Sequence, residues 1–283
     1  MGNGAMQAAL ETARAAATAG GEVIAARGRD IGAVRIKGSQ TDMVTETDIA
    51  AGVAVVRAIL SYDASARVVV EEPEVYDLTG VTRAELDDPE VWMIDPLDGT
   101  TSFVHGYPCY SVSVALLRDG DPVAGAVYNV AAGELCSAAQ GHGAFLDGTP
   151  IRTGSAARLD QALLITGFPY DRGATLDRQL AALARFLRAP VHGIRRDGSA
   201  AVDCCHVASG RADGFWEFGL QPWDTAAGVV ILREAGAVVT RTDGSPWSTS
   251  PGGIIAANPQ LHALMLEVVR GDAATGAPPA GRG

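Results

Sequence analysis

The sequence has no apolar run of about eighteen residues, so we expect no helix that crosses a membrane. Its N-terminus lacks a basic stretch followed by an apolar one, which argues against a secretory signal. Cysteine is scarce: the four residues show no metal-ligand spacing and are typical of free thiols in a reducing cytosol. Basic residues are also few, with 22 Lys and Arg against 33 Asp and Glu. The net charge of −11 argues against a nucleic-acid partner, and we expect a cytoplasmic protein.

The motifs of several catalytic classes are also missing. The sequence contains no G-x-S-x-G, no G-x-x-x-x-G-K and no H-E-x-x-H. Its five histidines are scattered, and Gly141-His-Gly143 fits a hairpin turn better than a dinucleotide-binding loop. The many acidic residues could instead converge on divalent cations, which would attract an anionic substrate.

The chain is long enough for a large core, with 283 residues of which 47% are hydrophobic. We expect two lobes that divide near residue 155. Residues 1–155 would form an α+β lobe and residues 156–270 an α/β lobe. The Gly/Ala/Pro-rich segment 271–283 has the composition of a disordered tail.

Apolar periodicity and turn residues predict the individual elements. The fold class is mixed α/β, with layered helices and sheets. Residues 74–90 are polar and predict a loop, and Tyr110–Thr153 predicts an antiparallel meander. Helices are expected near 6–26, 47–60, 174–187, 199–209, 225–235 and after Asn258-Pro259. The remaining strands are expected near 67–71, 91–95, 162–167, 191–195, 214–218, 237–240 and 253–257.

The strongest local signal is Asp95-Pro-Leu-Asp98-Gly-Thr-Thr101. Two carboxylates three residues apart follow an apolar strand, and Gly-Thr-Thr suits the start of a helix. Carboxylate oxygens suit magnesium, and free N–H groups at a helix start suit a phosphate. An ordinary strand–turn–helix with acidic caps would show the same pattern.

A second signal is Asp224, which stands where an N-cap belongs, with Gly236 as the C′ residue of the same helix. Capping explains Asp224 by itself. It becomes a ligand candidate because Glu71, Asp95 and Asp98 also lie at the ends of apolar elements, where ligand sites of α/β proteins gather.

Taken together, these motifs resemble the inositol monophosphatase family over nearly the whole chain. Its two signatures are similar to Trp92–Phe103 and Trp223–Gly236. Lys37, Asp42–Asp48 and Glu71-Glu72 precede them in the same order as in the family. The resemblance implies a layered αβαβα sandwich, as in inositol monophosphatase and fructose-1,6-bisphosphatase, and a homodimer.

The resemblance also implies two to three magnesium ions. Glu71, Asp95 and the carbonyl of Leu97 would hold the first, and Asp95, Asp98 and Asp224 the second. Glu71 with waters could hold a weaker third. Such ions neutralise phosphoryl oxygens and activate water for attack, without a covalent intermediate.

For catalysis, the resemblance assigns Thr100 to orient the attacking water, with Asp48 positioning Thr100 and Glu71 nearby. The phosphate would bind at Gly99, Thr100 and Thr101.

For the substrate, it assigns Glu217 to the polyol hydroxyls, with Ser199 and Ala200 lining the same pocket. A carboxylate can accept from two hydroxyl donors. An exposed strand residue is the plain alternative for Glu217. Lys37 and Glu72 are further candidates for the site.

Inositol monophosphate is the first expectation for the substrate, and several alternatives stay open. Histidinol phosphate is the second, although Thr101 is more similar to the inositol branch. Fructose bisphosphate and nucleotide 3′-phosphates carry further phosphate, for which the only basic cluster is Arg195-Arg196. Phosphatases of the haloacid dehalogenase type use two acids that are two residues apart. Asp95 and Asp98 are three residues apart, which argues against that class.

One departure from the family is Val70, where a glycine typically precedes the Glu pair. A β-branched residue does not readily adopt positive φ or allow close backbone approach, so Val70 could displace Glu71. It could equally extend the buried strand. The departure also leaves open a catalytically weak, metal-binding regulatory relative.

Overall fold

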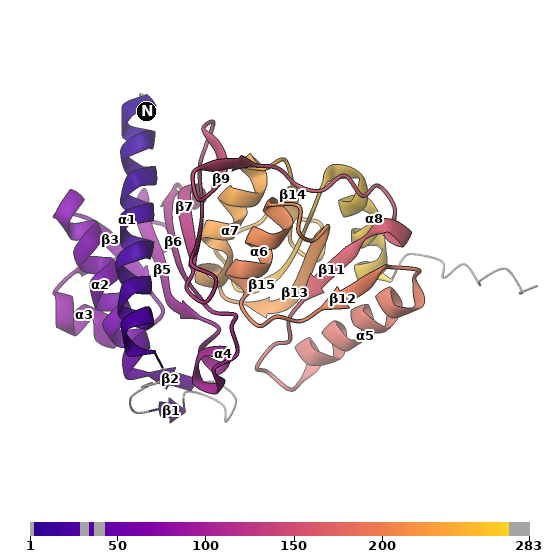
Figure 1. The fold of residues 1–283 in the computed structure, drawn as a ribbon, viewed down its shortest axis with the longest axis horizontal. Coiled ribbons are helices and arrows are strands. Elements are labelled where there is room, and N and C mark those ends of the chain that lie inside the picture. The colour runs from indigo at the N-terminus through magenta and orange to yellow at the C-terminus, as the bar shows by residue number, and fades with distance from the viewer. Residues whose placement is uncertain (1–2, 29–33, 37–42, 272–283) are drawn as a thin grey trace, which may run out of the picture.

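The computed structural model describes residues 3–28, 34–36 and 43–271. Helices and sheets alternate in five layers (Figure 1), which confirms the expected αβαβα class. Lys37, Asp42 and residues 272–283 of the expected tail lie outside the described residues. No helix in the described ranges has the length and apolar character needed to cross a membrane.

The first sheet has eight strands in the order β10-β9-β8-β7-β6-β5-β3-β4. Its antiparallel part, from β5 to β10, includes the meander predicted from Tyr110 to Thr153. β5, β3 and β4 are parallel. The strands are β3 (Arg67–Val70), β4 (Thr82–Arg83), β5 (Glu90–Asp98), β6 (Ser111–Arg118), β7 (Asp121–Asn129), β8 (Glu134–Ala139), β9 (Gly143–Leu146) and β10 (Thr149–Ile151).

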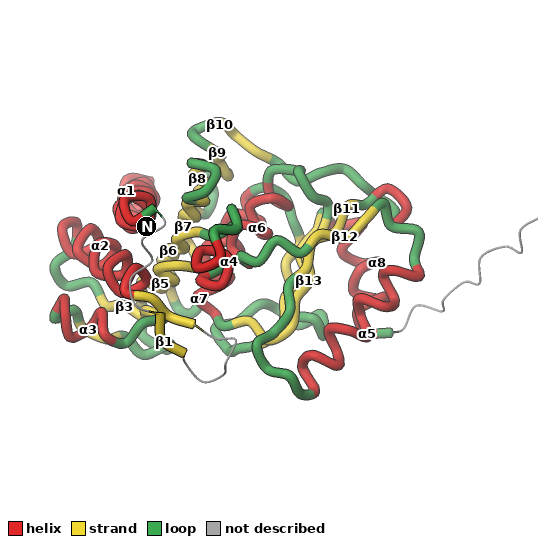
Figure 2. The backbone as a smooth tube through the Cα atoms, turned by 60° about the horizontal axis from the view of Figure 1, so that its bottom comes forward, coloured by secondary structure: helices red, strands yellow, loops and turns green. Residues whose placement is uncertain are grey.

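Two long helices, α1 (Asn3–Arg27) and α2 (Glu46–Tyr62), pack together against the outer face of this sheet (Figure 2). The Ala-rich sequence of α1 lets it approach closely, because its core face carries small side chains. A short hairpin, β1 (Val34–Ile36) with β2 (Met43–Thr45), precedes α2.

The second sheet has five strands in the order β12-β11-β13-β15-β14. Helices α5 (Ala174–Arg188) and α8 (Pro259–Arg270) cover its outer face (Figures 1 and 2). As predicted, Asn258 caps α8 and Pro259 is its first residue. The strands are β11 (Leu163–Thr166), β12 (Gly193–Arg195), β13 (Gly214–Leu220), β14 (Val238–Thr240) and β15 (Gly252–Ala257).

Helices α6 (Ala200–Ala208) and α7 (Pro222–Glu234) form the middle layer between the sheets (Figure 1). Both are apolar on nearly all sides because each contacts both sheets. Cys204 and Cys205 are buried core residues of α6, and all four cysteines are free thiols, as expected. The expected division near residue 155 falls between β10 and the 3₁₀ turn Leu159–Gln161, but one apolar core joins the first sheet to the middle layer.

The prediction of a loop over residues 74–90 was wrong. The segment contains α3 (Glu74–Thr79) and β4. Gly80 ends α3 in the left-handed conformation, and the Tyr76 hydroxyl accepts a hydrogen bond from the Val70 N–H at 3.0 Å. Such a short helix depends on this tertiary contact, which polar composition does not reveal.

Candidate active site

A β-bulge brings Asp95 and Asp98 to the same side of the sheet. Side chains alternate along a regular strand, so residues three apart would point to opposite faces. In β5, however, Asp95 pairs with Ser113 and Asp98 with Ser111, so one extra residue lies on β5. The bulge contains Pro96, which has no N–H to donate to the ladder. A spacing of three therefore gives two carboxylates on one face.

Gly99 turns the chain from β5 into α4 (Thr100–His105), which confirms the helix start expected there. Its φ of 92° lies in the left-handed region, and a Cβ would come within 2.9 Å of the carbonyls of Cys109 and Gly198. Only glycine fits this turn. The close approach sets the end of β5 against the chain that leads to Ser199 and α6.

Asp224 lies in the first turn of α7, but it is not the N-cap. The helix begins at Pro222, three residues before the predicted start, and Gln221 is the cap. Asp224 is the third helical residue and accepts a hydrogen bond from the Gln221 N–H at 2.8 Å. This is the reciprocal half of a capping box. The predicted Gly236 does follow the helix, with φ of 95°.

Glu71 and Glu72 follow β3 directly. Val70 pairs in regular parallel register with Ile94, and its side chain is buried in the core beneath α2. The Glu71 N–H then donates to the Ile94 carbonyl at 3.2 Å. Glu71 lines the same pocket as Asp95. The structure therefore supports the interpretation of Val70 as a strand residue chosen for packing, not as one that displaces Glu71.

Replacing Val70 with glycine should lower stability without changing magnesium activation. Loss of the buried side chain and of strand rigidity should cost about 2–4 kcal/mol. Thermal unfolding and magnesium activation curves of Val70→Gly and the native protein would test this. A shift of the variant's curve to lower magnesium would mean that Val70 does displace Glu71.

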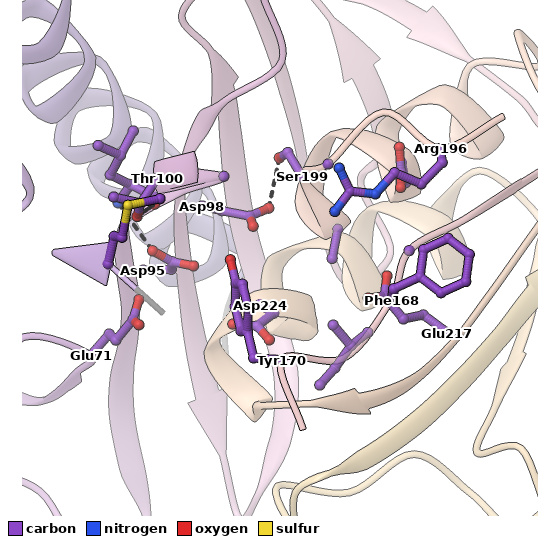
Figure 3. Close-up of a pocket in the computed structure, with 18 residues that line it drawn as sticks. Glu71, Asp95, Asp98, Thr100, Phe168, Tyr170, Arg196, Ser199, Glu217 and Asp224 are labelled. Atoms are coloured by element: carbon purple, nitrogen blue, oxygen red, sulfur yellow. Dashed lines mark hydrogen bonds between the residues drawn. The ribbon is translucent and has the colours of Figure 1, made fainter. Parts of the chain in front are cut away.

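One pocket gathers most of the predicted site residues (Figure 3). Glu71, Asp95, Asp98 and Asp224 lie on one side of it, and Glu217 and Arg196 on the other. The predicted residues that line it are Glu71, Asp95, Leu97, Asp98, Gly99, Thr100, Ser199, Ala200, Glu217 and Asp224. Of the predicted residues that the structure describes, three do not line it, namely Asp48, Glu72 and Thr101, although Asp48 contacts Thr100.

The carboxylates of this pocket oppose one another's ionisation. Burial raises the pKa of Asp95 well above its usual range, and the nearby Glu71, Asp98 and Asp224 raise it further. Burial likewise raises the pKa of Asp224, and the negative charges of Asp98 and Glu71 raise it further. Like charges held out of water favour the protonated form unless a cation compensates them. The pocket therefore has the electrostatics of a cation site.

Asp98 accepts hydrogen bonds from the start of α6. Burial raises its pKa to about 6, although donors from Ser199, Ala201 and Ala200 favour the charged form. The Ser199 hydroxyl and the Ala201 N–H each donate to it at 2.7 Å. Since both belong to the start of α6, these bonds join the carboxylate side of the pocket to the middle layer.

Asp48 and Thr100 form the predicted pair. The Thr100 hydroxyl lies 2.9 Å from an Asp48 oxygen and 3.1 Å from the Leu97 carbonyl, and it can donate to either. Asp48 is buried in the first turn of α2, where the Thr45 N–H also donates to it at 2.8 Å. Burial raises the pKa of Asp48, which the Thr45 hydrogen bonds partly oppose.

Glu217 is not the exposed strand residue of the plain alternative. It is 6% exposed on β13, and burial, with a contribution from Asp98, raises its pKa to about 8. Arg196 opposes this rise. A Cβ on Gly167 would lie 2.2 Å from a Glu217 carboxylate oxygen, so only glycine leaves room for this side chain.

Several lining residues were not predicted for the site from the sequence. Phe168 and Tyr170 come from the loop after β11, and Arg196, which the sequence marked only as part of a basic pair, comes from the chain after β12. Asp203 lies on the buried face of α6. A charged residue within the apolar run Ala200–Ala208 was the one available signal for it, whereas the loop residues carry no motif.

Comparison with known proteins decides the family. The profile of the inositol monophosphatase family matches residues 5–272. This chain belongs to that family. An inositol-1-monophosphatase from Synechocystis is 41% identical over 257 residues, covering 91% of this chain and 87% of the relative. A putative Nus factor SuhB from Neisseria meningitidis serogroup B is 38% identical over 261 residues, covering 92% and 97%.

Solved structures agree. The inositol monophosphatase from Anabaena superimposes with a TM-score of 0.82 at 34% identity, over 94% of this chain and 97% of that one. Membership in the inositol monophosphatase family indicates a phosphatase that acts on a small phosphorylated substrate. The family is in general magnesium-dependent.

Proposed function

We propose that this inositol monophosphatase family member is a magnesium-dependent phosphomonoesterase for a small polyol phosphate, with inositol monophosphate as the preferred substrate. The observation that carries the proposal is the convergence of four carboxylates from separate segments in one pocket. Burial and mutual repulsion raise the pKa values of Asp95, Asp98 and Asp224. Such an arrangement is unfavourable unless cations occupy it.

The donor set fits magnesium, which takes oxygen ligands and keeps several waters. Glu71, Asp95 and the Leu97 carbonyl would hold one ion, and Asp95, Asp98 and Asp224 a second, with Glu71 available for a third. When bound, these ions supply charge neutralisation at the phosphoryl group and a lowered pKa of water. The hydrogen bond from the Leu97 N–H to Asp95, at 3.0 Å, fixes the orientation of the Asp95 carboxylate.

Thr100 and Asp48 would orient the attacking water. When the Thr100 hydroxyl donates to Asp48, the lone pairs of its oxygen can accept a hydrogen bond from a water in the pocket. Asp48 is held in turn by Thr45, so the direction of the Thr100 hydroxyl is set before substrate arrives. Gly99 and Thr100 would contact the phosphate, and Thr101 could contribute only through its main chain, since it does not line the pocket.

The other side of the pocket would select the alcohol. Glu217 lies on that side (Figure 3), and Ser199 and Ala200 line the same pocket. Whether neutral or charged, a buried carboxyl group can accept a hydrogen bond from a hydroxyl of the substrate. An analogue that lacks the hydroxyl would leave the buried Glu217 carboxyl group without that hydrogen bond, which costs more than the net value of the bond itself.

Glu217→Gln should raise KM for inositol monophosphate more than KM for glycerol phosphate. With a pKa of about 8, Glu217 is largely neutral at pH 7, so losing one of its hydrogen bonds is worth about 0.5–1.5 kcal/mol, or up to about tenfold in KM. Steady-state kinetics on both substrates would measure the difference. An equal change for the two would remove Glu217 from polyol recognition.

Gly167→Ala should give the same selective defect by displacing the Glu217 side chain. The new methyl group would meet the end of a flexible side chain, so the protein should still fold. We expect KM for inositol monophosphate to rise by up to about tenfold, with a less than additive effect in combination with Glu217→Gln. Fully additive effects would contradict the coupling of the two residues.

Some relatives are named Nus factor SuhB, which raises the alternative of a regulatory protein with weak catalysis. Sequence identity does not separate the two groups, because both lie between 36% and 41%. The predicted metal ligands Asp95, Asp98 and Asp224, with the Asp48–Thr100 pair, favour an enzyme. The same family resemblance supports a homodimer, and the free thiols support a reducing, cytoplasmic location.

A substrate panel tests the proposal. Phosphate release would be measured with inositol 1-phosphate, histidinol phosphate, glycerol phosphate, fructose 1,6-bisphosphate and a nucleotide 3′-phosphate at saturating magnesium. We expect the highest kcat/KM for inositol 1-phosphate. A clear preference for another substrate would correct the substrate, and no turnover of any would favour the regulatory alternative.

A further inference from the structure

A second group of metal-ligand side chains adjoins the catalytic pocket, and one of its members, Asp203, also lines that pocket. Asp197, Asp203 and His206 each offer a ligand atom, and these atoms all lie within 4.8 Å of one another. His206 Nδ1 is 3.9 Å from an Asp197 oxygen. In the described part of the chain, no other three His, Cys, Asp or Glu side chains meet this spacing, and the catalytic carboxylates are spaced more widely.

The local fold accounts for this grouping. Asp203 and His206 are three residues apart on α6 and therefore share one face of the helix. Asp197 belongs to the connection between β12 and α6, which returns along that face. Ser199, in the same connection, caps α6 and donates to Asp98.

Asp203 is the member whose buried carboxylate is not fully hydrogen-bonded. It is 1% exposed, and its Oδ1 has no hydrogen-bond partner. Glu217, Asp197 and Asp98 add negative charge around it, and Arg196 is the cation that opposes them. A buried carboxylate with an unpaired oxygen costs several kcal/mol unless a proton or a cation neutralises it.

The other two members suit a metal ion. Burial lowers the pKa of His206, so its imidazole is neutral near pH 7, the form that binds metals. The side chains of His206 and Asp197 are 25% and 26% exposed, which leaves a path for an ion from solvent. The neighbouring Arg211 does not compete, because it is paired with Glu134 at 2.7 Å.

We propose that Asp197, Asp203 and His206 form a second site, adjoining the catalytic pocket, for a divalent first-row transition ion, such as Mn²⁺ or Zn²⁺. One imidazole and two carboxylates favour such an ion over magnesium, which prefers oxygen ligands alone. The ion would tie the β12–α6 connection to α6 and so brace the wall of the catalytic pocket that carries Ser199 and Ala200. The proposal does not depend on the identity of the phosphate substrate.

Pulsed EPR on the tag-free protein loaded with Mn²⁺ distinguishes this site from the catalytic one. The described residues that line the catalytic pocket include no histidine, so Mn²⁺ there would have oxygen ligands. We expect the native protein to show coupling of Mn²⁺ to one imidazole nitrogen. The coupling should disappear in His206→Gln and persist in His105→Gln, a matched change at an exposed histidine at the end of α4.

Equilibrium dialysis with Mn²⁺ gives a second readout. The native protein should bind one ion more than His206→Gln, or bind it at least about tenfold more tightly, since even changes outside the ligand shell cost that much. Asp203→Asn should show the same loss. The absence of nitrogen coupling in the native protein, its persistence in His206→Gln, or unchanged binding by Asp203→Asn would each overturn the proposal.

Discussion

Asp95→Asn is expected to reduce phosphate release at least about 100-fold while making the metal-free protein more stable. The Asp95 carboxylate is proposed as a ligand of both principal magnesium ions. Removing its charge should therefore weaken the binding of both ions and the stabilisation of the transition state that they provide. Without metal, burial and the neighbouring Glu71, Asp98 and Asp224 raise the pKa of Asp95 above its ordinary 3.8. Asparagine removes that penalty and can still accept the Leu97 N–H.

The sign of this stability effect depends on pH. A carboxyl group whose pKa is raised by folding binds its proton more tightly in the native state, so native stability falls as pH rises above about 3.8. In EDTA, the gap in Tm between Asp95→Asn and the native protein should therefore widen from pH 5 to pH 8. A variant that keeps near-native activity, or is less stable than the native protein at pH 8, would contradict the assignment of Asp95.

Thr100→Val should lower kcat about 100-fold or more with a much smaller change in KM. Valine preserves the shape of the side chain but removes the hydroxyl that lies 2.9 Å from Asp48. Loss of a group that orients or accepts a proton from the nucleophile is typically worth 10²–10⁴-fold. Steady-state kinetics at saturating magnesium would measure the effect.

The adjacent Thr101→Val is the matched control. Thr101 belongs to the same short helix but does not line the pocket, so its side chain should be dispensable. We expect activity within about threefold of the native value, since a surface change away from such features usually shifts free energy by about 0.5 kcal/mol or less. Equal losses in both variants would mean that α4, and not the Thr100 hydroxyl, is what each change disturbs.

Most of the fold follows from local patterns in the sequence. The meander is marked by Asp119-Gly120 and Asp147-Gly148, whose positive φ values close the hairpins. The start of α8 is likewise set by Asn258-Pro259. The prediction for residues 74–90 failed because α3 is too short to show a hydrophobic periodicity. Its stability depends instead on the hydrogen bond between its Tyr76 hydroxyl and the Val70 N–H of β3.

The grouping of the four carboxylates in one pocket could be predicted, but not the way in which the fold brings them together. Spacing alone did not reveal that a bulge at Pro96 puts Asp95 and Asp98 on one face. Asp224 was placed as an N-cap because the preceding Pro222 was not recognised as the first residue of the helix.

The alcohol side was harder to predict, since its residues meet only through tertiary packing. Glu217 was identified through the family resemblance, and its burial against Gly167 could not be inferred from either position alone. Arg196 lies in the connection from β12 to α6 and Asp203 on α6 itself, and both meet Glu217 of β13 at the pocket. Neither belongs to a motif with a fixed spacing.

The central claim is that the carboxylate pocket binds magnesium for phosphate ester hydrolysis. The most direct test measures phosphate release from inositol 1-phosphate after removal of metal with EDTA, followed by titration with magnesium, for the native protein and Asp224→Asn. We predict no turnover without metal, full and saturable recovery of the native protein, and a large loss in Asp224→Asn at every magnesium concentration. Turnover that survives EDTA, or equal recovery of the two proteins, would contradict the claim.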